Sequence, residues 1–290
     1  MFSIITDTSA NLPSGYLREN HILSLPFFYI IDGKEYEPNV TFDGPSFYAQ
    51  MRQGVRVTTS QITPQQFLNG ALPLLEKGED VLYVGMSSGI SGAFASASKG
   101  TEGLIWRFPD RKIRLVDTLG ASLGEGLLVM EAVRCREAGM SLDETADLLM
   151  TLRHRMCQVF SVDDLKYLRA TGRVSGVKAL LGTVLNIKPL LKGDRDGRIV
   201  CIDRARGRAR AITALAEKYN ALAVEPEKQV VGIAHADCPE DAERLASLLR
   251  TQRPPKDILT VCYEPVTGSH VGPGALALFF LGDQDVRDKA

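Results

Sequence analysis

The sequence has no long apolar run, no excess of one charge and no basic leader, and each absence excludes a class of protein. No stretch of the 290 residues approaches the roughly 18 consecutive apolar residues of a membrane span. The opening residues MFSIITDTSA have neither a basic segment nor a long apolar run, so we expect no signal peptide and a cytoplasmic protein. Lys and Arg total 34 and Asp and Glu total 35, and this balance argues against nucleic acid or an anionic membrane as the main partner.

Paired cysteines are also missing. The five cysteines lie far apart and form no C-x-x-C motif, so neither a zinc site nor a disulfide framework is expected. Free, buried thiols are the simpler interpretation of these positions: Cys135, Cys157, Cys201, Cys238 and Cys262.

Nucleotide-binding motifs are absent as well. The chain contains no G-x-x-x-x-G-K-[ST] phosphate loop and no complete G-x-G-x-x-G fingerprint. We therefore expect the protein to carry no cofactor of its own.

The first half alternates short apolar segments with amphipathic ones. This alternation predicts an α/β domain with a mainly parallel sheet over residues 1–157. The expected strands are Phe2–Thr6, Asp80–Gly85 and Lys112–Asp117; the expected helices include Ala93–Lys99, Gly126–Ala138 and one opened by a capping box at Ser141-Leu142-Asp143-Glu144.

The second half predicts a smaller α+β domain over residues 158–290, with the boundary near residues 154–162. A hairpin is expected from Leu180–Leu191 through a turn at residues 193–197 to a return strand at Ile199–Asp203. Two strand–helix units follow, with strands at Gln229–Ala234 and Ile258–Tyr263 and helices at Ala209–Tyr219 and Glu240–Arg250.

Three segments rich in hydroxyl groups and glycine are candidate binding loops: residues 58–61, 87–92 and 268–274. The second of them follows a predicted strand and precedes a predicted helix, so its backbone N–H groups could bind an anion at the helix N-terminus. An ordinary serine-rich loop between strand and helix explains the same pattern.

The segment Gly89–Ala93 also comes close to the nucleophile elbow G-x-S-x-G, with alanine in the last position. Ser91 with His270 or His235 as base would make a serine hydrolase acting on an acyl ester, but no triad acid can be named. Among glycines, His270 is expected in an exposed loop, whereas His235 is better explained as a structural histidine.

A run of arginines at residues 204–210 is the strongest local charge. It either forms a solvated helix start or, because four cations oppose the helix dipole, marks a docking surface or a nearby anion.

Five segments, taken in order, resemble the motifs of the DegV family, whose members include the fatty-acid-binding subunits of bacterial fatty acid kinase. They span most of the chain: IITDTSANLP (4–13), TTSQIT (58–63), SSGISG (87–92), GRVS (172–175) and HVGPGAL (270–276). Each motif is weak alone, but all five occur in the family's order.

The resemblance implies two α/β domains with a long-chain fatty acid buried between or within them. It implies that Thr59 and Ser91 hold the carboxylate, with Ser60 and Gly92 in the same motifs and His270 close to the head group. Burying roughly 14 methylenes at about 0.8 kcal/mol each would supply about 11 kcal/mol before association costs. Two departures from the family pattern, Ile62 for a proline and Phe279 for a smaller residue, bear on the pocket shape.

The resemblance also implies a partner, an ATP-dependent kinase subunit that phosphorylates the bound carboxylate. Arg173 and Arg206 are then the partner-binding residues, although Arg204 or Arg208 could take the place of Arg206. The protein itself would be a monomer without catalytic activity. A protein–protein adaptor with no ligand is the third class of function left open.

Overall fold

The computed structural model describes residues 2–37, 42–175 and 186–290. The first sheet has four strands in the order β2-β1-β6-β7, all parallel: β1 (Phe2–Asp7), β2 (Ile22–Leu25), β6 (Asp80–Gly85) and β7 (Ile113–Asp117). Three of these strands coincide with predicted ones, and the expected mainly parallel sheet is confirmed.

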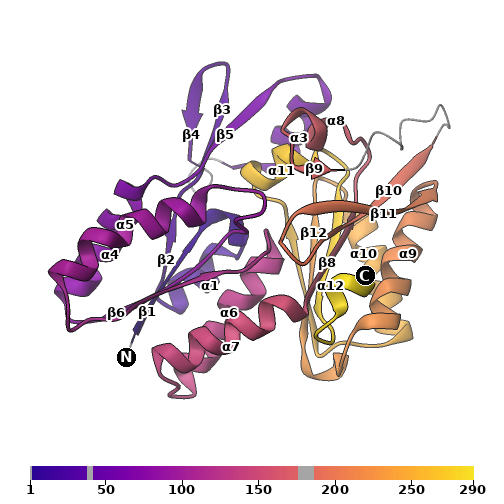
Figure 1. Ribbon diagram of the computed structural model, residues 1–290. Helices are drawn as coiled ribbons and strands as arrows, with labels where there is room; N and C mark the ends of the chain where they lie inside the picture. The colour runs from indigo at the N-terminus through magenta and orange to yellow at the C-terminus, as the bar shows by residue number, and fades with distance from the viewer. Residues whose placement is uncertain (1, 38–41, 176–185) are drawn as a thin grey trace.

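Helices cover both faces of this sheet, with α4 and α5 on one side and α6 and α7 on the other (Figure 1). The helical segments of this half are α1 (Ser14–Glu19), α3 (Gly44–Arg52), α4 (Pro64–Glu76), α5 (Ala93–Arg107), α6 (Leu123–Glu137), α7 (Leu142–Arg155) and the 3₁₀ turn η1 (Thr8–Ala10). The predicted capping box opens α7, where the Ser141 hydroxyl accepts from the Glu144 N–H and the Glu144 carboxylate accepts from the Ser141 N–H.

A small antiparallel sheet interrupts this pattern and was not predicted. Its strands are β3 (Phe28–Ile31), β4 (Lys34–Tyr36) and β5 (Val57–Ser60), in the order β4-β3-β5. Tyr29 on β3 stacks on Tyr36 and meets Phe47 of α3 edge-on, so aromatic packing holds the sheet against that helix. The sheet matters because β5 carries Thr58, Thr59 and Ser60.

The second half forms a mixed sheet with the strand order β13-β12-β14-β8-β10-β11-β9. The strands are β8 (Met156–Ser161), β9 (Val174–Ser175), β10 (Ile187–Gly193), β11 (Ile199–Arg206), β12 (Val230–His235), β13 (Asp257–Cys262) and β14 (Leu276–Leu281). The helical segments are α8 (Lys166–Ala170), α9 (Arg208–Leu222), η3 (Pro226–Lys228), α10 (Pro239–Gln252), α11 (Pro265–Val271) and α12 (Val286–Lys289). A mixed sheet with helices confirms the expected α+β character.

The two faces of this sheet have different neighbours. Val159, Leu278 and Phe280 pack in a core with α9 and α10, which lie together on one side of the sheet (Figure 1). The alternate residues Phe160 and Phe279 belong to the other core, which continues into the first half of the chain. The predicted domain boundary at residues 157/158 falls inside β8, so a division that keeps this sheet whole would precede Met156; the division itself stays a prediction.

The arginine run does not open a helix as expected. Arg204 and Arg206 lie on β11, which continues three residues beyond the predicted strand, and only Arg208 and Arg210 lie in α9. Pairing with β10 extends the strand, since Arg206 lies opposite Ile187 and Arg204 opposite Pro189. The first part of the predicted hairpin, residues 180–185, lies outside the described residues.

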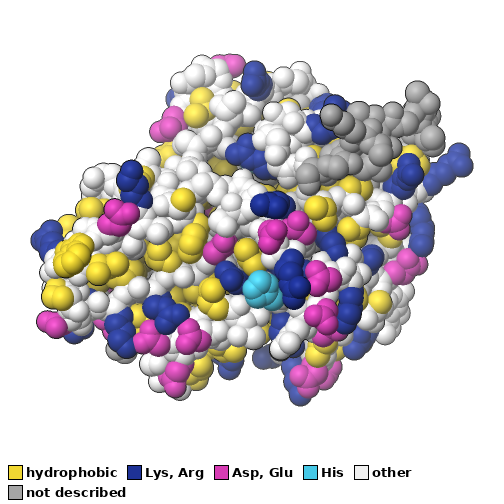
Figure 2. Space-filling model, in the orientation of Figure 1, with side chains coloured by type: hydrophobic (Ala, Val, Ile, Leu, Met, Phe, Trp, Pro, Cys, Tyr) yellow, Lys and Arg dark blue, Asp and Glu magenta, His cyan; other side chains and the backbone are white. Residues whose placement is uncertain are grey.

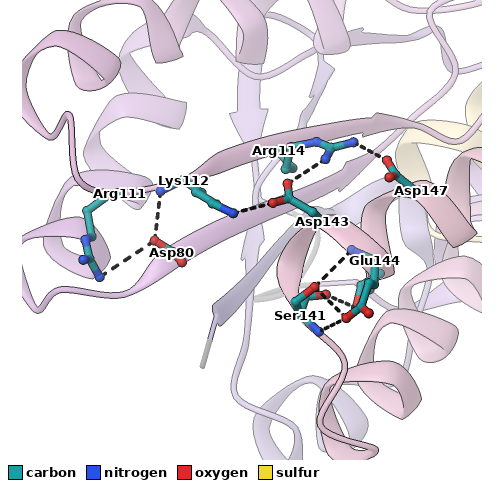
Figure 3. Close-up of polar contacts among 9 residues, drawn as sticks. Asp80, Arg111, Lys112, Arg114, Ser141, Asp143, Glu144 and Asp147 are labelled. Atoms are coloured by element: carbon teal, nitrogen blue, oxygen red, sulfur yellow. Dashed lines mark hydrogen bonds and ion pairs between the residues drawn. The ribbon is translucent and has the colours of Figure 1, made fainter.

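Acidic and basic side chains are interspersed over the face drawn in Figure 2, and apolar side chains gather over α4 and α5. Figure 3 shows one mixed cluster, in which Asp143 at the start of α7 pairs with Lys112, which precedes β7, and with Arg114 on β7. All five cysteines are free, with Cys135 and Cys157 buried and the other three half-buried. No helix within the described ranges is both long and apolar enough to cross a membrane.

Candidate functional site

A cavity of about 480 Å³ lies where the two halves of the chain meet. It opens beyond the carboxyl ends of β6 and β7, the position at which open α/β sheets bind ligands. The small sheet contributes β5, and the mixed sheet contributes β8, β14 and the β10–β11 hairpin; α11 completes the wall. The volume falls within the roughly 300–1,000 Å³ typical of small-molecule sites.

The walls of the cavity are mainly apolar. Among the described residues that line it there is no Asp, Glu or Lys, and Arg173 is the only one with a permanent charge. The apolar lining residues include Phe27, Ile62, Met86, Ile90, Leu119, Phe160, Leu168, Val266, Val271 and Phe279. Such a surface suits a hydrocarbon with a single anionic group.

Hydroxyl groups and a histidine gather at one end of the cavity. Thr59 Oγ1 on β5 lies 3.0 Å from His270 Nε2 on α11, although the two residues are 211 positions apart in the chain. Burial, with a smaller contribution from the Arg173 charge, lowers the pKa of His270 to about 4. The imidazole is therefore neutral at neutral pH, and its Nε2 can donate or accept a hydrogen bond.

Gln61, two residues after Thr59, connects its segment to the loop at residues 87–92. Its side-chain carbonyl Oε1 accepts hydrogen bonds from the Ser91 hydroxyl at 3.2 Å and from the Gly92 N–H at 2.8 Å. A Cβ at Gly92 would lie 2.7 Å from Gln61 Nε2, so a larger residue here would make the Gln61 amide shift. The arrangement holds the Ser91 hydroxyl beside the start of α5.

Arg173 stands at the mouth of the cavity. It is exposed, its Nε donates to the Ile90 carbonyl at 3.4 Å, and no ion pair to it occurs within the described ranges. Arg173 also lines a shallower depression outside, together with Ser91, Gly92 and Arg198. Its positive charge is thus available to an anion at the boundary between cavity and solvent.

The geometry does not form a Ser–His–acid triad. Ser91 Oγ bonds to Gln61 and His270 Nε2 to Thr59, so the two residues have different partners. His270 Nδ1 is buried with no hydrogen-bond partner in the described part of the chain, which leaves no acid to orient the ring. The same part of the chain contains no group of three or more His, Cys, Asp or Glu placed to hold a metal ion.

A family model described as "Uncharacterised protein, DegV family" matches residues 1–283. The chain belongs to the DegV family. A DegV domain-containing protein of Clostridium perfringens is 37% identical over 284 residues, which cover 97% of this chain and 98% of that protein. A second, from Lactococcus lactis, is 34% identical over 280 residues and 96% of both chains.

Solved DegV-family structures share the fold along the whole chain. The structure described as fatty acid binding of a DegV family protein from Thermus thermophilus has a TM-score of 0.89 and 28% identity, covering 97% of this chain and 99% of that one. A fatty acid binding DegV family protein from Streptococcus agalactiae has a TM-score of 0.86 and 28% identity, covering 98% and 99%.

Four of the five DegV motifs contribute residues to the cavity or to its rim, whereas residues 4–13 do not line it. Thr59, Ser60, Ser91 and His270 line the cavity, and Gly92 lies beside it. Arg206 does not line the cavity; it is exposed on β11. The individual roles expected for these residues stay predictions.

The expectation of an exposed loop at His270 is wrong. His270 lies in α11 and is half-buried; the helix forms because Glu264 caps it and Pro265 occupies its first turn. The glycines of the DegV motif follow the helix instead. Gly272 and Gly274 have φ of +81° and +78°, and a Cβ at Gly272 would lie 2.1 Å from the Tyr167 ring.

Sequence reasoning missed several residues of the cavity. Gln61 stood in a quoted DegV motif and could have been singled out there, whereas Gln158 and Phe160 on β8 belong to no motif. The two departures from the family pattern, Ile62 and Phe279, both line the cavity and are almost fully buried.

Proposed function

We propose that this protein binds a long-chain fatty acid in the cavity, with the carboxylate at the end formed by Thr59, Ser91 and His270. The observation that carries the proposal is the combination of an apolar lining, one cation and a cluster of hydroxyl groups at one end. A carboxylate there would accept hydrogen bonds from Thr59 and Ser91, with Ser60 and Gly92 beside them. The Thermus and Streptococcus relatives described as fatty-acid-binding support this ligand class.

The neutral state of His270 fits a binding role. A neutral imidazole can donate its single N–H to Thr59 Oγ1, which leaves the Thr59 O–H to donate to the carboxylate, and it adds no buried charge. Arg173 at the mouth supplies the positive charge that balances the carboxylate. No step in this role needs catalysis by the chain itself.

The direct test is mass spectrometry of an organic extract of the purified protein, followed by titration of the delipidated protein with stearic acid. We expect a long-chain fatty acid at close to one per chain. Extracts without lipid, together with no binding of added fatty acid, would contradict the proposal and favour an adaptor.

Thr59→Ala and Ser91→Ala should each weaken fatty acid binding about tenfold, because each removes a hydrogen bond to a charged group. Thr58→Ala is the matched control, since Thr58 precedes Thr59 on β5 but is exposed and does not line the cavity. Unchanged affinity in both Thr59 and Ser91 variants would remove the proposed head-group site.

We further propose that a kinase subunit transfers the γ-phosphoryl group of ATP to a carboxylate oxygen of the bound fatty acid, giving an acyl phosphate and ADP. The depression beside Arg173 gives a partner access to the head-group end. Arg206 is exposed on β11 and forms no ion pair within the described ranges, so it is free to contact such a partner. We propose that the protein acts in the cytoplasm as a monomer. It neither binds nucleic acid nor inserts into a membrane in this role.

Arg206→Ala should leave fatty acid affinity unchanged and slow phosphorylation by the kinase subunit. Arg210→Ala is the control, because Arg210 is paired with Glu217 on α9. Arg204→Ala and Arg208→Ala decide which arginine acts. Loss of fatty acid affinity in the Arg206 variant would place this residue in the binding site instead.

A further inference from the structure

Gln158 places an amide in the apolar wall of the cavity. It lies on β8 opposite Phe279 of β14, and both side chains line the cavity. Leu276, the first residue of β14 after α11, pairs with Ser161 of β8. Gln158 is three residues from Ser161, so it lies roughly 10 Å along the strand from the sheet end next to α11. This distance separates the amide from the head-group end.

The hydrogen bonds of Gln158 leave half of its capacity free. Its Nε2 donates to the Leu119 carbonyl at 3.1 Å, and its Oε1 accepts from the Ala121 N–H at 3.3 Å. These partners fix the orientation of the amide, since exchanging N and O would lose both bonds. An amide has two N–H groups and two lone pairs on oxygen, and one of each is left without a partner in the described part of the chain.

The backbone at two glycines packs closely against the amide. A Cβ at Gly120 would lie 3.0 Å from Gln158 Nε2, and one at Gly124 would lie 2.4 Å from its Oε1. Gln158 is only 8% exposed and lines the cavity, so a ligand in the cavity is the partner that its unpaired N–H and lone pair can reach without solvent. A buried amide with one N–H and one lone pair unpaired is a poorer wall for a plain hydrocarbon than a leucine side chain would be.

We propose that the cavity selects fatty acids that carry a hydroxyl group in the middle of the chain, with the Gln158 amide as its partner. A hydroxyl group both donates and accepts one hydrogen bond, which matches the free lone pair and the free N–H of the amide. The inference rests on the proposed function, since it requires the carboxylate to lie at the end of the cavity formed by Thr59, Ser91 and His270. A bound water molecule satisfying the amide is the competing explanation.

The test compares stearic acid with a series of monohydroxystearic acids that differ in the position of the hydroxyl group, in competition for the delipidated full-length protein. We expect one mid-chain isomer to bind at least as tightly as stearic acid. Isomers hydroxylated elsewhere should bind about tenfold more weakly than stearic acid, because their hydroxyl group would be buried against an apolar wall without a partner. Weaker binding of every isomer than of stearic acid would overturn the inference and leave the proposed function intact. Failure of all these acids to bind would overturn the proposed function itself.

Variants connect the preference to the amide. In Gln158→Leu, the ratio of affinities between the preferred isomer and stearic acid should fall about tenfold; the ratio is informative even if the fold loosens, because both ligands use the same cavity. Phe279→Leu is the matched control, since it changes the wall opposite Gln158 but keeps the amide. An unchanged ratio in Gln158→Leu, or an equal fall in both variants, would overturn the role of Gln158.

Discussion

Two fully buried carboxyl groups, those of Asp7 and Glu125, share one hydroxyl group. Ser9 Oγ lies 2.6 Å from Asp7 Oδ1 and 2.5 Å from Glu125 Oε2, yet a hydroxyl has a single hydrogen to donate. One of the two short contacts therefore requires a proton on a carboxyl group. Burial, with the neighbouring Asp7 charge, raises the pKa of Glu125 well above its usual range, so we assign the proton to Glu125.

This proton makes stability fall as pH rises. The folded state keeps a proton on Glu125 that the unfolded state releases near its ordinary pKa of 4.5, so the free energy of unfolding decreases above that pH, by up to about 1.4 kcal/mol per pH unit. Denaturant titrations between about pH 5 and pH 8 should show a flatter pH profile for Glu125→Gln than for the wild type. Glu131→Gln, on the same helix but ion-paired with Arg134, should keep the wild-type profile. Parallel profiles for wild type and Glu125→Gln would place the proton elsewhere.

At the scale of elements, two helices begin with a capping box, but only one of them begins at the cavity. In α7 the box is Ser141 with Glu144 (Figure 3), and in α4 it is Thr63 with Gln66. Ser141→Ala and Thr63→Ala should each lower the free energy of unfolding by about 1 kcal/mol. Only Thr63→Ala should also weaken fatty acid binding, because Thr63 lines the cavity and follows Gln61, which holds Ser91. Equal affinity in both variants, measured by fluorescent fatty acid displacement, would show that the start of α4 does not position the site.

Elements of this kind also show what the sequence can predict. The box at Ser141 and the strand at Asp80–Gly85 depend on residues close in the chain, so both could be predicted. The pairing of β3 with β5 and the contact between Thr59 and His270 depend on residues far apart in the chain, so neither could be predicted. The strand β5 has only four residues and shows no clear alternation of buried and exposed positions. The site residues were accessible only through motifs, and Gln158 has none, because the sequence does not reveal which face of β8 meets the cavity.

At the scale of the whole molecule, the cavity joins two halves of the chain. Thr59 and Ser91 come from the first half, and Phe160, His270 and Phe279 from the second. A ligand that contacts both walls stabilises only the state in which they are together, and linkage gives about 2.7 kcal/mol when the free ligand is at 100 times its Kd.

We therefore expect fatty acid to raise the unfolding temperature of the delipidated protein by about 5 °C, as a single transition. Calorimetry with and without stearic acid measures the shift, and the double variant Thr59→Ala/Ser91→Ala should lose most of it at the same ligand concentration. Two transitions, of which the ligand moves only one, would mean that the halves unfold independently and that the ligand contacts only one wall. The same result would support the predicted boundary near residues 154–162 as a boundary between separately unfolding domains. The half whose unfolding temperature rises with ligand would be the half that binds it.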